Sequence, residues 1–221
     1  MSLLKRKLTK MDALAVIMAL AALAALSYVG NRVLSRLIFE THLRSEISRI
    51  CQHACEQRQR LVAAISAYKQ SFGSYPPDHV IRKDPVIVDP VTNQLYYELH
   101  GTIYDASNHS STLLNSSMHL SASLVREFFN TERFKNSAET PEAVKHFLPA
   151  TEPLMEVHEK PESIGVLSFW PNWEGANADA LAEIRFGSWQ YNSSKPEHNP
   201  GGFDLWIEIQ APGTNIVIGN W

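Results

Sequence analysis

Residues 13–29 read ALAVIMALAALAALSYV, a run of 17 residues without a charged side chain. As a helix with a rise of about 1.5 Å per residue, the run would extend about 25 Å, at the short end of what a bilayer requires. Basic residues flank the run: Lys5, Arg6, Lys7 and Lys10 precede it, and Arg32 and Arg36 follow it. The sequence therefore predicts one membrane anchor, and the basic residues before it favour a cytoplasmic N-terminus.

A cleaved secretory signal is the main alternative for this segment. A basic start, an apolar core and the Ala-Leu-Ala triplet at residues 22–24 fit that description. After Asn31, however, a helical pattern without Gly or Pro continues up to Gly73. A signal peptide has no reason to continue in phase into a long helix, so we prefer the anchor.

The pattern after the anchor predicts an amphipathic helix. Apolar or small residues recur at steps of three, four or seven, at Leu43, Ile47, Ile50, Ala54, Leu61, Ile65, Tyr68 and Phe72. Charged and polar residues occupy the other side, where pairs such as Glu40 and Arg44 are spaced four apart. The whole segment 8–72 would be a helix of 65 residues.

A helix of that length is about 98 Å long, more than a compact head requires. We expect its first half to lie in a bilayer or a filament core, and its second half to pack against a head formed by the remaining chain. A membrane-anchored coiled coil is the alternative. The apolar stripe covers only about four heptads, and it is interrupted at Gln57, where a coiled coil requires an apolar residue.

Composition limits the remaining possibilities. With 221 residues, of which 44% are hydrophobic, the chain can bury one core. The formal net charge of -3 gives no reason to expect a nucleic-acid partner. The two cysteines, Cys51 and Cys55, lie on one face of the long helix and leave the head without disulfides. They are either small packing residues or thiols that meet a metal or a partner helix.

Residues 8–26, LTKMDALAVIMALAALAAL, resemble the N-terminal segment of type IV pilins and type II secretion pseudopilins, in which Phe-Thr-Leu-x-Glu opens an apolar helix. On this alignment Leu8 is the first mature residue, Thr9 matches the threonine at the second position, and Asp12 stands for the glutamate at the fifth. The end of the helix is similar too: AISAY at residues 64–68 and GSYP at residues 73–76 match the pseudopilin pattern.

The helix end also has a physical interpretation. Gly73 can cap the helix in a left-handed conformation, Pro76 prevents its continuation, and Tyr75 is expected to fold back onto it. The resemblance implies an α+β, pilin-like fold, in which a long N-terminal helix packs on a small antiparallel sheet. We expect residues 1–72 to form the anchor and helix and residues 73–221 the head. Within the head, Ile65, Tyr68 and Tyr75 are the expected packing contacts with the helix.

The rest of the head is predicted from propensity and turn residues. DPVTNQLYY at residues 89–97 resembles a pseudopilin stretch and predicts a turn followed by a strand over 95–99. Residues 120–129 and 141–148 are predicted to be short helices starting near Ser121 and Pro141, inside an insertion covering about 108–153. Strands are expected over 164–169, 184–191, 203–210 and 215–218, with a hairpin turn at residues 211–214. These strands look like the C-terminal hairpins of major pseudopilins.

The chain also departs from the family pattern. Prepilin peptidase requires a small residue before the mature start, and Lys7 stands there. In the family the carboxylate at the fifth position pairs with the freed amine of a neighbouring subunit. Without cleavage Leu8 has no such amine, and Asp12 would instead pair with Lys5, Lys7 or Lys10 near the headgroups. The loop after Trp206 lacks the carboxylates that calcium requires, so no metal site is carried over. Asp204 is expected to be a hydrogen-bonding residue at a strand end.

No catalytic motif occurs in the sequence, and we predict neither an enzyme nor a cofactor. Five tryptophans, Trp170, Trp173, Trp189, Trp206 and Trp221, lie in the last 52 residues and indicate either core packing or a sugar-binding or partner-binding face. Two functions follow: a secretion or pilus assembly subunit, or a membrane-tethered periplasmic binding domain on a pilin scaffold. The expected location is the bacterial inner membrane with a periplasmic head, or a pilus-like filament. The expected partners are lipid, other pilin-like subunits and an inner-membrane assembly platform.

Overall fold

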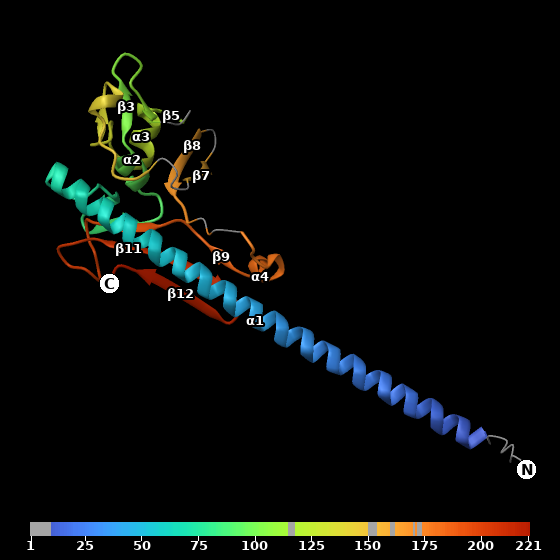
Figure 1. The fold of residues 1–221 in the computed structure, drawn as a ribbon. Helices are drawn as coiled ribbons and strands as arrows, with labels where there is room; N and C mark the ends of the chain where they lie inside the picture. Colours follow the sequence, from blue (N-terminus) through green and yellow to red (C-terminus); the bar gives the residue numbers. More distant parts are fainter. Residues whose placement is uncertain (1–9, 115–117, 150–153, 160–161, 170, 172–173) are drawn as a thin grey trace, which may run out of the picture. The chain divides into compact units, whose positions relative to one another are not determined.

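The structure is a computed structural model that describes residues 10–114, 118–149, 154–159, 162–169, 171 and 174–221. It is an α+β protein with a long N-terminal helix and small sheets that are antiparallel except for one short pairing (Figure 1). The described chain divides into two compact units, which meet between Glu46 and Ile47. The elements up to the middle of the chain are α1 (Lys10–Phe72), β1 (His79–Lys83), β2 (Val86–Asp89), α2 (Leu95–His100), β3 (Thr102–Asp105), β4 (Ser110–Leu113), β5 (His119–Ser121) and α3 (Ala122–Phe129). The remaining elements are β6 (Ser137–Ala138), the 3₁₀ turn η1 (Pro141–Ala143), β7 (Leu154–Glu159), β8 (Glu162–Leu167), α4 (Ala178–Ala182), β9 (Arg185–Phe186), β10 (Gln190–Asn192), β11 (Asp204–Ala211) and β12 (Thr214–Gly219).

Helix α1 confirms the predicted long helix over the residues that are described. It runs for 63 residues from Lys10, and the predicted first two residues of the helix, Leu8 and Thr9, lie outside the described part. It ends as expected: Gly73 adopts a left-handed φ of 76°, and its N–H donates to the Lys69 carbonyl over 2.8 Å. Only glycine adopts this conformation without strain, so Gly73 sets the C-terminus of the helix.

The first unit exposes apolar side chains on every side of the helix. Twelve large apolar residues between Val16 and Ile38 are 50–69% exposed: Val16, Ile17, Met18, Leu20, Leu23, Leu26, Tyr28, Val29, Val33, Leu34, Leu37 and Ile38. A helix that is apolar all round is suited to a nonpolar environment rather than to water. Within the described residues, α1 is the one helix long and apolar enough to cross a membrane.

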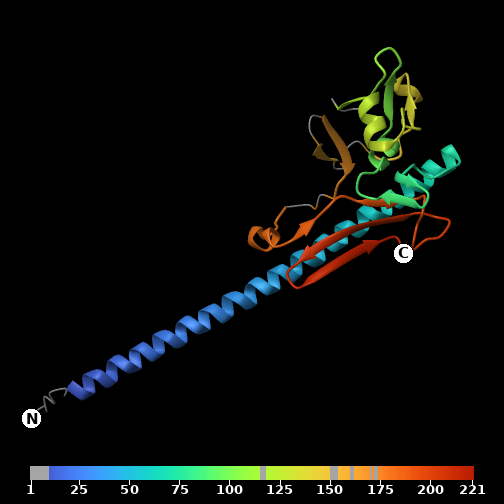
Figure 2. The same ribbon diagram turned by 180° about the vertical axis from the view of Figure 1, so that it is seen from behind.

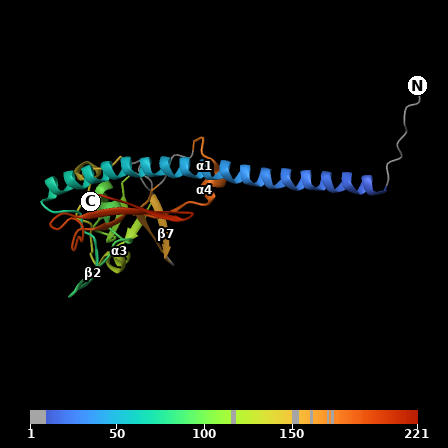
Figure 3. The ribbon, with the colours of Figure 1, turned by 90° about the horizontal axis from the view of Figure 1, so that it is seen from below.

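In the second unit the last part of α1 lies along the C-terminal sheet, in the order β10-β11-β12 with β9 also paired to β11 (Figures 1 and 2). Figure 3 shows these strands running beneath the helix. The predicted hairpin is confirmed, because Ala211 pairs with Thr214 and Gly213 has a left-handed φ of 75°. Side chains alternate along β11, so that one face is fully buried and the other is partly exposed. The buried faces consist of Ile50, Ala54, Leu61, Ile65 and Tyr68 on α1 and Leu205, Ile207 and Ile209 on β11.

Gln57 interrupts the apolar stripe because its amide joins the helix to the sheet. It is 3% exposed, its Nε2 donates to the Ser168 carbonyl over 3.4 Å, and its Oε1 accepts from Trp189 Nε1 over 2.9 Å. The indole of Trp189 is itself fully buried. A buried amide with partners at both ends fixes the register of helix and sheet, because any slide would leave polar groups unpaired.

The segment between α1 and the C-terminal sheet contains more strands than the sequence indicated. β3, β4, β5 and β6 form a four-stranded sheet in the order β5-β4-β3-β6, and β1 pairs with β2 and β7 with β8. Helix α3 is confirmed, with Ser121 as its N-cap: the Ser121 hydroxyl accepts from the N–H of Leu124. The predicted insertion therefore supplies strands as well as a helix.

The predicted strand over 95–99 is wrong, because these residues form helix α2. All six residues of α2 are buried, and the Asn93 side chain accepts from the Leu95 N–H over 3.1 Å, which starts the turn. Gly101, with φ of 80°, ends it. Tyrosines favour strands on average, but here burial on every side decides the conformation.

The predicted helix over 141–148 shrinks to η1 for a related reason. The Asn136 side chain hydrogen-bonds to both backbone groups of Lys145: its Nδ2 donates to the Lys145 carbonyl and its Oδ1 accepts from the Lys145 N–H. The Phe147 N–H donates to the Leu99 carbonyl. These backbone groups are hydrogen-bonded to other segments and cannot form the hydrogen bonds of a helix.

The predicted strand over 184–191 splits into β9 and β10, because Ser188 bridges to Ser168 and the Trp189 N–H donates to the Leu167 carbonyl.

Replacing Ile65 with Asp should unfold the head, because Ile65 is 0% exposed and an unpaired buried carboxylate costs several kcal/mol. Ser66→Asp is the matched control, since it places the same charge on the neighbouring, exposed position of α1. Chemical unfolding of the detergent-solubilised chain, followed by near-UV circular dichroism, measures both. An Ile65→Asp variant with the unfolding midpoint of Ser66→Asp would contradict the packing described above.

Candidate functional site

The structure places the predicted site residues at two kinds of position. Leu8 and Thr9 lie outside the described residues, and Asp12 lies in the first turns of α1. Ile65 and Tyr68 are fully buried in the head, and Tyr75 is half-buried just after the helix.

Tyr75 folds back toward the helix as expected. Its ring packs edge-on against Phe203 at 5.2 Å between centroids, and the Lys69 ammonium lies 4.0 Å from its ring centroid. The ring therefore joins the end of α1 to the start of β11 through an aromatic contact and a cation–π contact.

Tyr68 anchors a buried carboxylate. Its hydroxyl donates to Glu98 Oε2 over 2.8 Å, while the N–H groups of Lys135 and Asn136 donate to Glu98 Oε1 and Oε2 over 2.7 and 2.8 Å. Burial raises the pKa of Glu98, and these three hydrogen bonds oppose the shift without cancelling it. The Tyr68–Glu98 pair ties α1, α2 and the 135–136 loop together, which is a structural role.

The helical thiols do not assemble a metal site in the described chain. Cys51 and Cys55 are free and half-buried, and the nearby His53 lies 3.8 Å from the Glu56 carboxylate instead. Across the described residues no group of three or more His, Cys, Asp or Glu side chains is placed to hold a metal ion.

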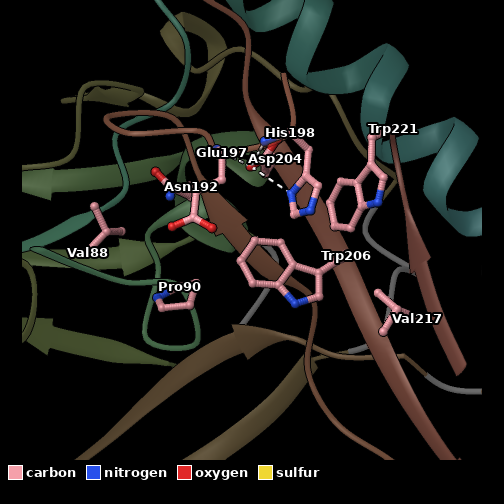
Figure 4. Close-up of a pocket in the computed structure, with 9 residues that line it drawn as sticks. All are labelled: Val88, Pro90, Asn192, Glu197, His198, Asp204, Trp206, Val217 and Trp221. Carbon is pink, nitrogen blue, oxygen red and sulfur yellow. Dashed lines mark hydrogen bonds and ion pairs between the residues drawn. The ribbon is translucent and has the colours of Figure 1, made fainter. Parts of the chain in front are cut away.

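A pocket of about 570 Å³ opens on the face of the C-terminal sheet that points away from the buried core. It is lined by Val88, Pro90, Asn192, Glu197, His198, Asp204, Trp206, Val217 and Trp221 (Figure 4). This volume is in the range of small-molecule sites. Trp206 reaches the pocket because it alternates with the buried Leu205 and Ile207 along β11.

Asp204 holds the loop that forms one wall of the pocket. Its carboxylate accepts from the N–H groups of Glu197, His198 and Asn199 over 2.6, 3.0 and 2.9 Å. Burial would raise the pKa of Asp204, but the hydrogen bonds from His198, Glu197 and Asn199 outweigh burial and lower it. The predicted role of Asp204 as a hydrogen-bonding residue at a strand end is confirmed.

Aromatic rings form the other wall of the pocket. The His198 ring stacks on Trp221 at 3.8 Å between centroids and 10° between planes, and Trp206 is tilted by 59° from Trp221 at 6.0 Å. His198 Nδ1 also lies 3.4 Å from Asp204 Oδ2, which orients the imidazole. Figure 4 shows the Glu197 carboxylate pointing into the space between Asn192, Pro90 and Trp206.

Sequence reasoning singled out the tryptophans but missed Glu197 and His198. Trp189 proves to be core, Trp206 and Trp221 line the pocket, and Trp170 and Trp173 lie outside the described residues. Alternation along β11 could have indicated that Trp206 points outward. No local pattern indicated Glu197 and His198, because the fold of the 192–204 loop brings them to the sheet.

Comparison of the chain with protein families, with curated proteins and with solved structures finds no match.

Glu98 gives the head a pH dependence whose sign follows from its raised pKa. In the unfolded chain Glu titrates near a pKa of about 4.3, so the folded state takes up this proton at a higher pH than the unfolded state does. The free energy of unfolding of the wild type, relative to Glu98→Gln, should therefore increase as the pH falls from 8 and level off below about 4.3.

Urea unfolding across this pH range measures the effect, with Glu139→Gln as the control because Glu139 is an exposed carboxylate. The control should follow the wild type. If the difference in the free energy of unfolding between the wild type and Glu98→Gln became smaller toward low pH, the pKa of Glu98 would be lowered by folding and not raised.

Proposed function

We propose that this chain is an assembly subunit resembling a pseudopilin, in a machine related to type II secretion systems or type IV pili. In this role the N-terminus is cytoplasmic, the first half of α1 sits in the inner membrane or in a filament core, and the head is periplasmic. Its partners are lipid, other pilin-like subunits and an inner-membrane assembly platform.

The observation that carries the proposal is the change in apolar pattern along α1. Residues 13–29 are apolar on all sides, as a lipid-embedded or filament-core helix requires. Beyond them the exposed apolar residues narrow to one stripe, formed by Val33, Leu34, Leu37 and Ile38. Arg32 and Arg36 lie on the other side, and Arg36 pairs with Glu40 over 3.1 Å. A one-sided apolar stripe that no described residue of the first unit covers is suited to packing against another helix.

The rest of the molecule is compatible with this role. The pilin-like segments at residues 8–26 and 73–76 stand at the two ends of α1, and the cap that the second segment implied forms at Gly73. The second half of α1 contributes a buried wall to an α+β head, as the resemblance implies. The absence of a small residue before Leu8 leaves the processing of this subunit as the feature that an experiment must decide.

A membrane-tethered periplasmic binding domain is the second candidate, and the pocket at Trp206 and Trp221 is the observation that favours it. A subunit whose only task is assembly has no need of an aromatic-lined pocket on the outer face of its sheet. Glycan-array binding by the full chain would support this role, and crosslinking to pilin-like partners would support the first.

The assembly role predicts contact along the exposed stripe. A photo-crosslinking amino acid at Leu37 should capture a second copy or another pilin-like subunit in the native membrane. The same amino acid at Ser35 is the control, because residues two apart point to nearly opposite sides of a helix. Gel analysis and mass spectrometry of the products give the readout. Lipid adducts alone at Leu37, or equal protein capture at both positions, would contradict the proposed helix packing.

Lys7 predicts that the chain is not processed by a prepilin peptidase. Coexpression with a cognate peptidase should leave the wild type at full length, and Lys7→Gly should shorten it by seven residues. A long cationic side chain next to the scissile bond would otherwise have to enter a site shaped for a small residue. Intact mass of the membrane-extracted protein distinguishes the two products.

Asp12→Ala tests the same point through assembly. In an unprocessed chain the change should be mild, because a carboxylate near several lysines at the headgroups is worth at most about 1 kcal/mol. In a processed subunit it should abolish assembly by stranding a buried amine. A wild type already cut before Leu8, with Asp12→Ala excluded from crosslinked products, would show an ordinary pseudopilin instead.

A further inference from the structure

The charge balance of the pocket is one-sided. None of its nine lining residues is Lys or Arg, and two of them are carboxylates. Asp204 is 2% exposed, and its oxygens are occupied by the N–H groups of the 197–199 loop. Glu197 is exposed, and within the described chain its carboxylate has no hydrogen bond or ion pair. The Glu197 carboxylate is therefore the negative charge that is available to a ligand, because no described residue neutralises it.

The aromatic walls complement that charge. Trp206 and Trp221 are inclined to each other by 59° with centroids 6.0 Å apart, so the two indoles bound the pocket at an angle. The His198 imidazole stacks on Trp221, and in Figure 4 it lies on the side of Trp221 that faces Glu197 and Trp206. Indole faces are electron-rich and attract cations, and pairs of such faces beside a carboxylate are typical of sites for alkylammonium groups.

Other ligand classes fit less well. A sugar requires several donors and acceptors, but Asn192 is already bonded at both ends to Lys195, over 2.7 and 2.9 Å, and Asp204 is occupied, which leaves Glu197 as the free carboxylate of the lining. Hydroxyls buried without partners would cost free energy. A neutral apolar ligand would fill the pocket without using Glu197. An anion would meet the carboxylate and no lining cation.

We propose that the pocket between Trp206, Trp221 and Glu197 binds an alkylammonium group. The Trp206 indole contacts the cation beside the Trp221–His198 stack and Glu197 supplies the counter-charge, while Asp204 acts through the loop as a positioning residue. The cation belongs either to a small soluble quaternary ammonium compound or to a lysine side chain of a protein partner. The inference does not require the assembly role, and it specifies the ligand class for the binding-domain candidate.

Choline is the first probe, added to the full chain in a polyoxyethylene detergent whose headgroup is neither a sugar nor a choline ester. Indole N–H resonances of Trp206 and Trp221, assigned with Trp→Phe variants, report binding. Sodium chloride at equal concentration controls for ionic strength. We expect saturable shifts in both resonances, and at least about fivefold weaker binding of 3,3-dimethylbutan-1-ol, which has the shape of choline without its charge.

Variants test the two parts of the site separately. Trp206→Leu keeps an apolar side chain but removes the indole face, and should weaken choline binding about tenfold. Glu197→Gln should weaken it about fivefold and reduce its salt dependence. Glu208→Gln is the matched control: it removes a carboxylate from the same exposed face of β11, two residues from Trp206 and outside the pocket, and should change nothing. Thermal unfolding of each variant verifies the fold.

Two further probes identify the source of the cation. A peptide containing trimethyl-lysine or lysine that binds more tightly than choline, at the same two resonances, assigns the site to a protein partner; tighter choline binding assigns it to a small molecule. Equal binding of choline and its neutral analogue would overturn the proposal. Unchanged choline binding by Trp206→Leu would also overturn it. Binding of methyl glycosides in place of cations would overturn it too, but would still support a binding domain.

Discussion

The structure depends on one long helix, α1, whose two parts have different surroundings. Between Val16 and Val29 the apolar side chains of α1 are exposed on all sides, whereas in the second unit one face of α1 is buried by the head. Water tolerates the charged side of the second part but not the exposed apolar surface of the first. The head can therefore fold around the end of a helix whose beginning is suited to a nonpolar environment. The proposed assembly role follows from this change in pattern.

Buried polar side chains, rather than disulfides, hold the head in register. Gln57 joins α1 to Trp189 and Ser168, and Glu98 joins Tyr68 to the 135–136 loop. Each of these groups has partners that belong to distant parts of the chain. The hydrophobic effect is non-directional, whereas hydrogen bonds weaken steeply when their distance or angle changes. The aliphatic core stabilises the head, and these polar pairs define one arrangement of it.

The alternation of inward and outward side chains along β11 creates one wall of the pocket. Because Leu205 and Ile207 point into the core, Trp206 must point out, and Val217, which pairs with Glu208, lies on the same face from β12. The 192–204 loop, held by hydrogen bonds to Asp204 and Asn220, then brings Glu197 and His198 beside this ring. Loops supply the chemistry and the rigid sheet fixes its position. The aromatic and acidic residues of the pocket therefore lie on the outer face of a sheet whose inner face forms part of the core.

The sequence by itself determined the elements whose signals are local. The apolar run at 13–29, the end of α1 at Gly73, the cap at Ser121 and the turn at 211–214 each depend on a few neighbouring residues. Tertiary structure decided the rest. Residues 95–100 became a helix because burial surrounds them, and residues 144–148 formed no helix because Asn136 and Leu99 hydrogen-bond to the backbone groups of Lys145 and Phe147. Glu197 and Trp206 meet only after a loop closes on a strand. Such outcomes depend on partners far away in the chain, and a local pattern carries no information about them.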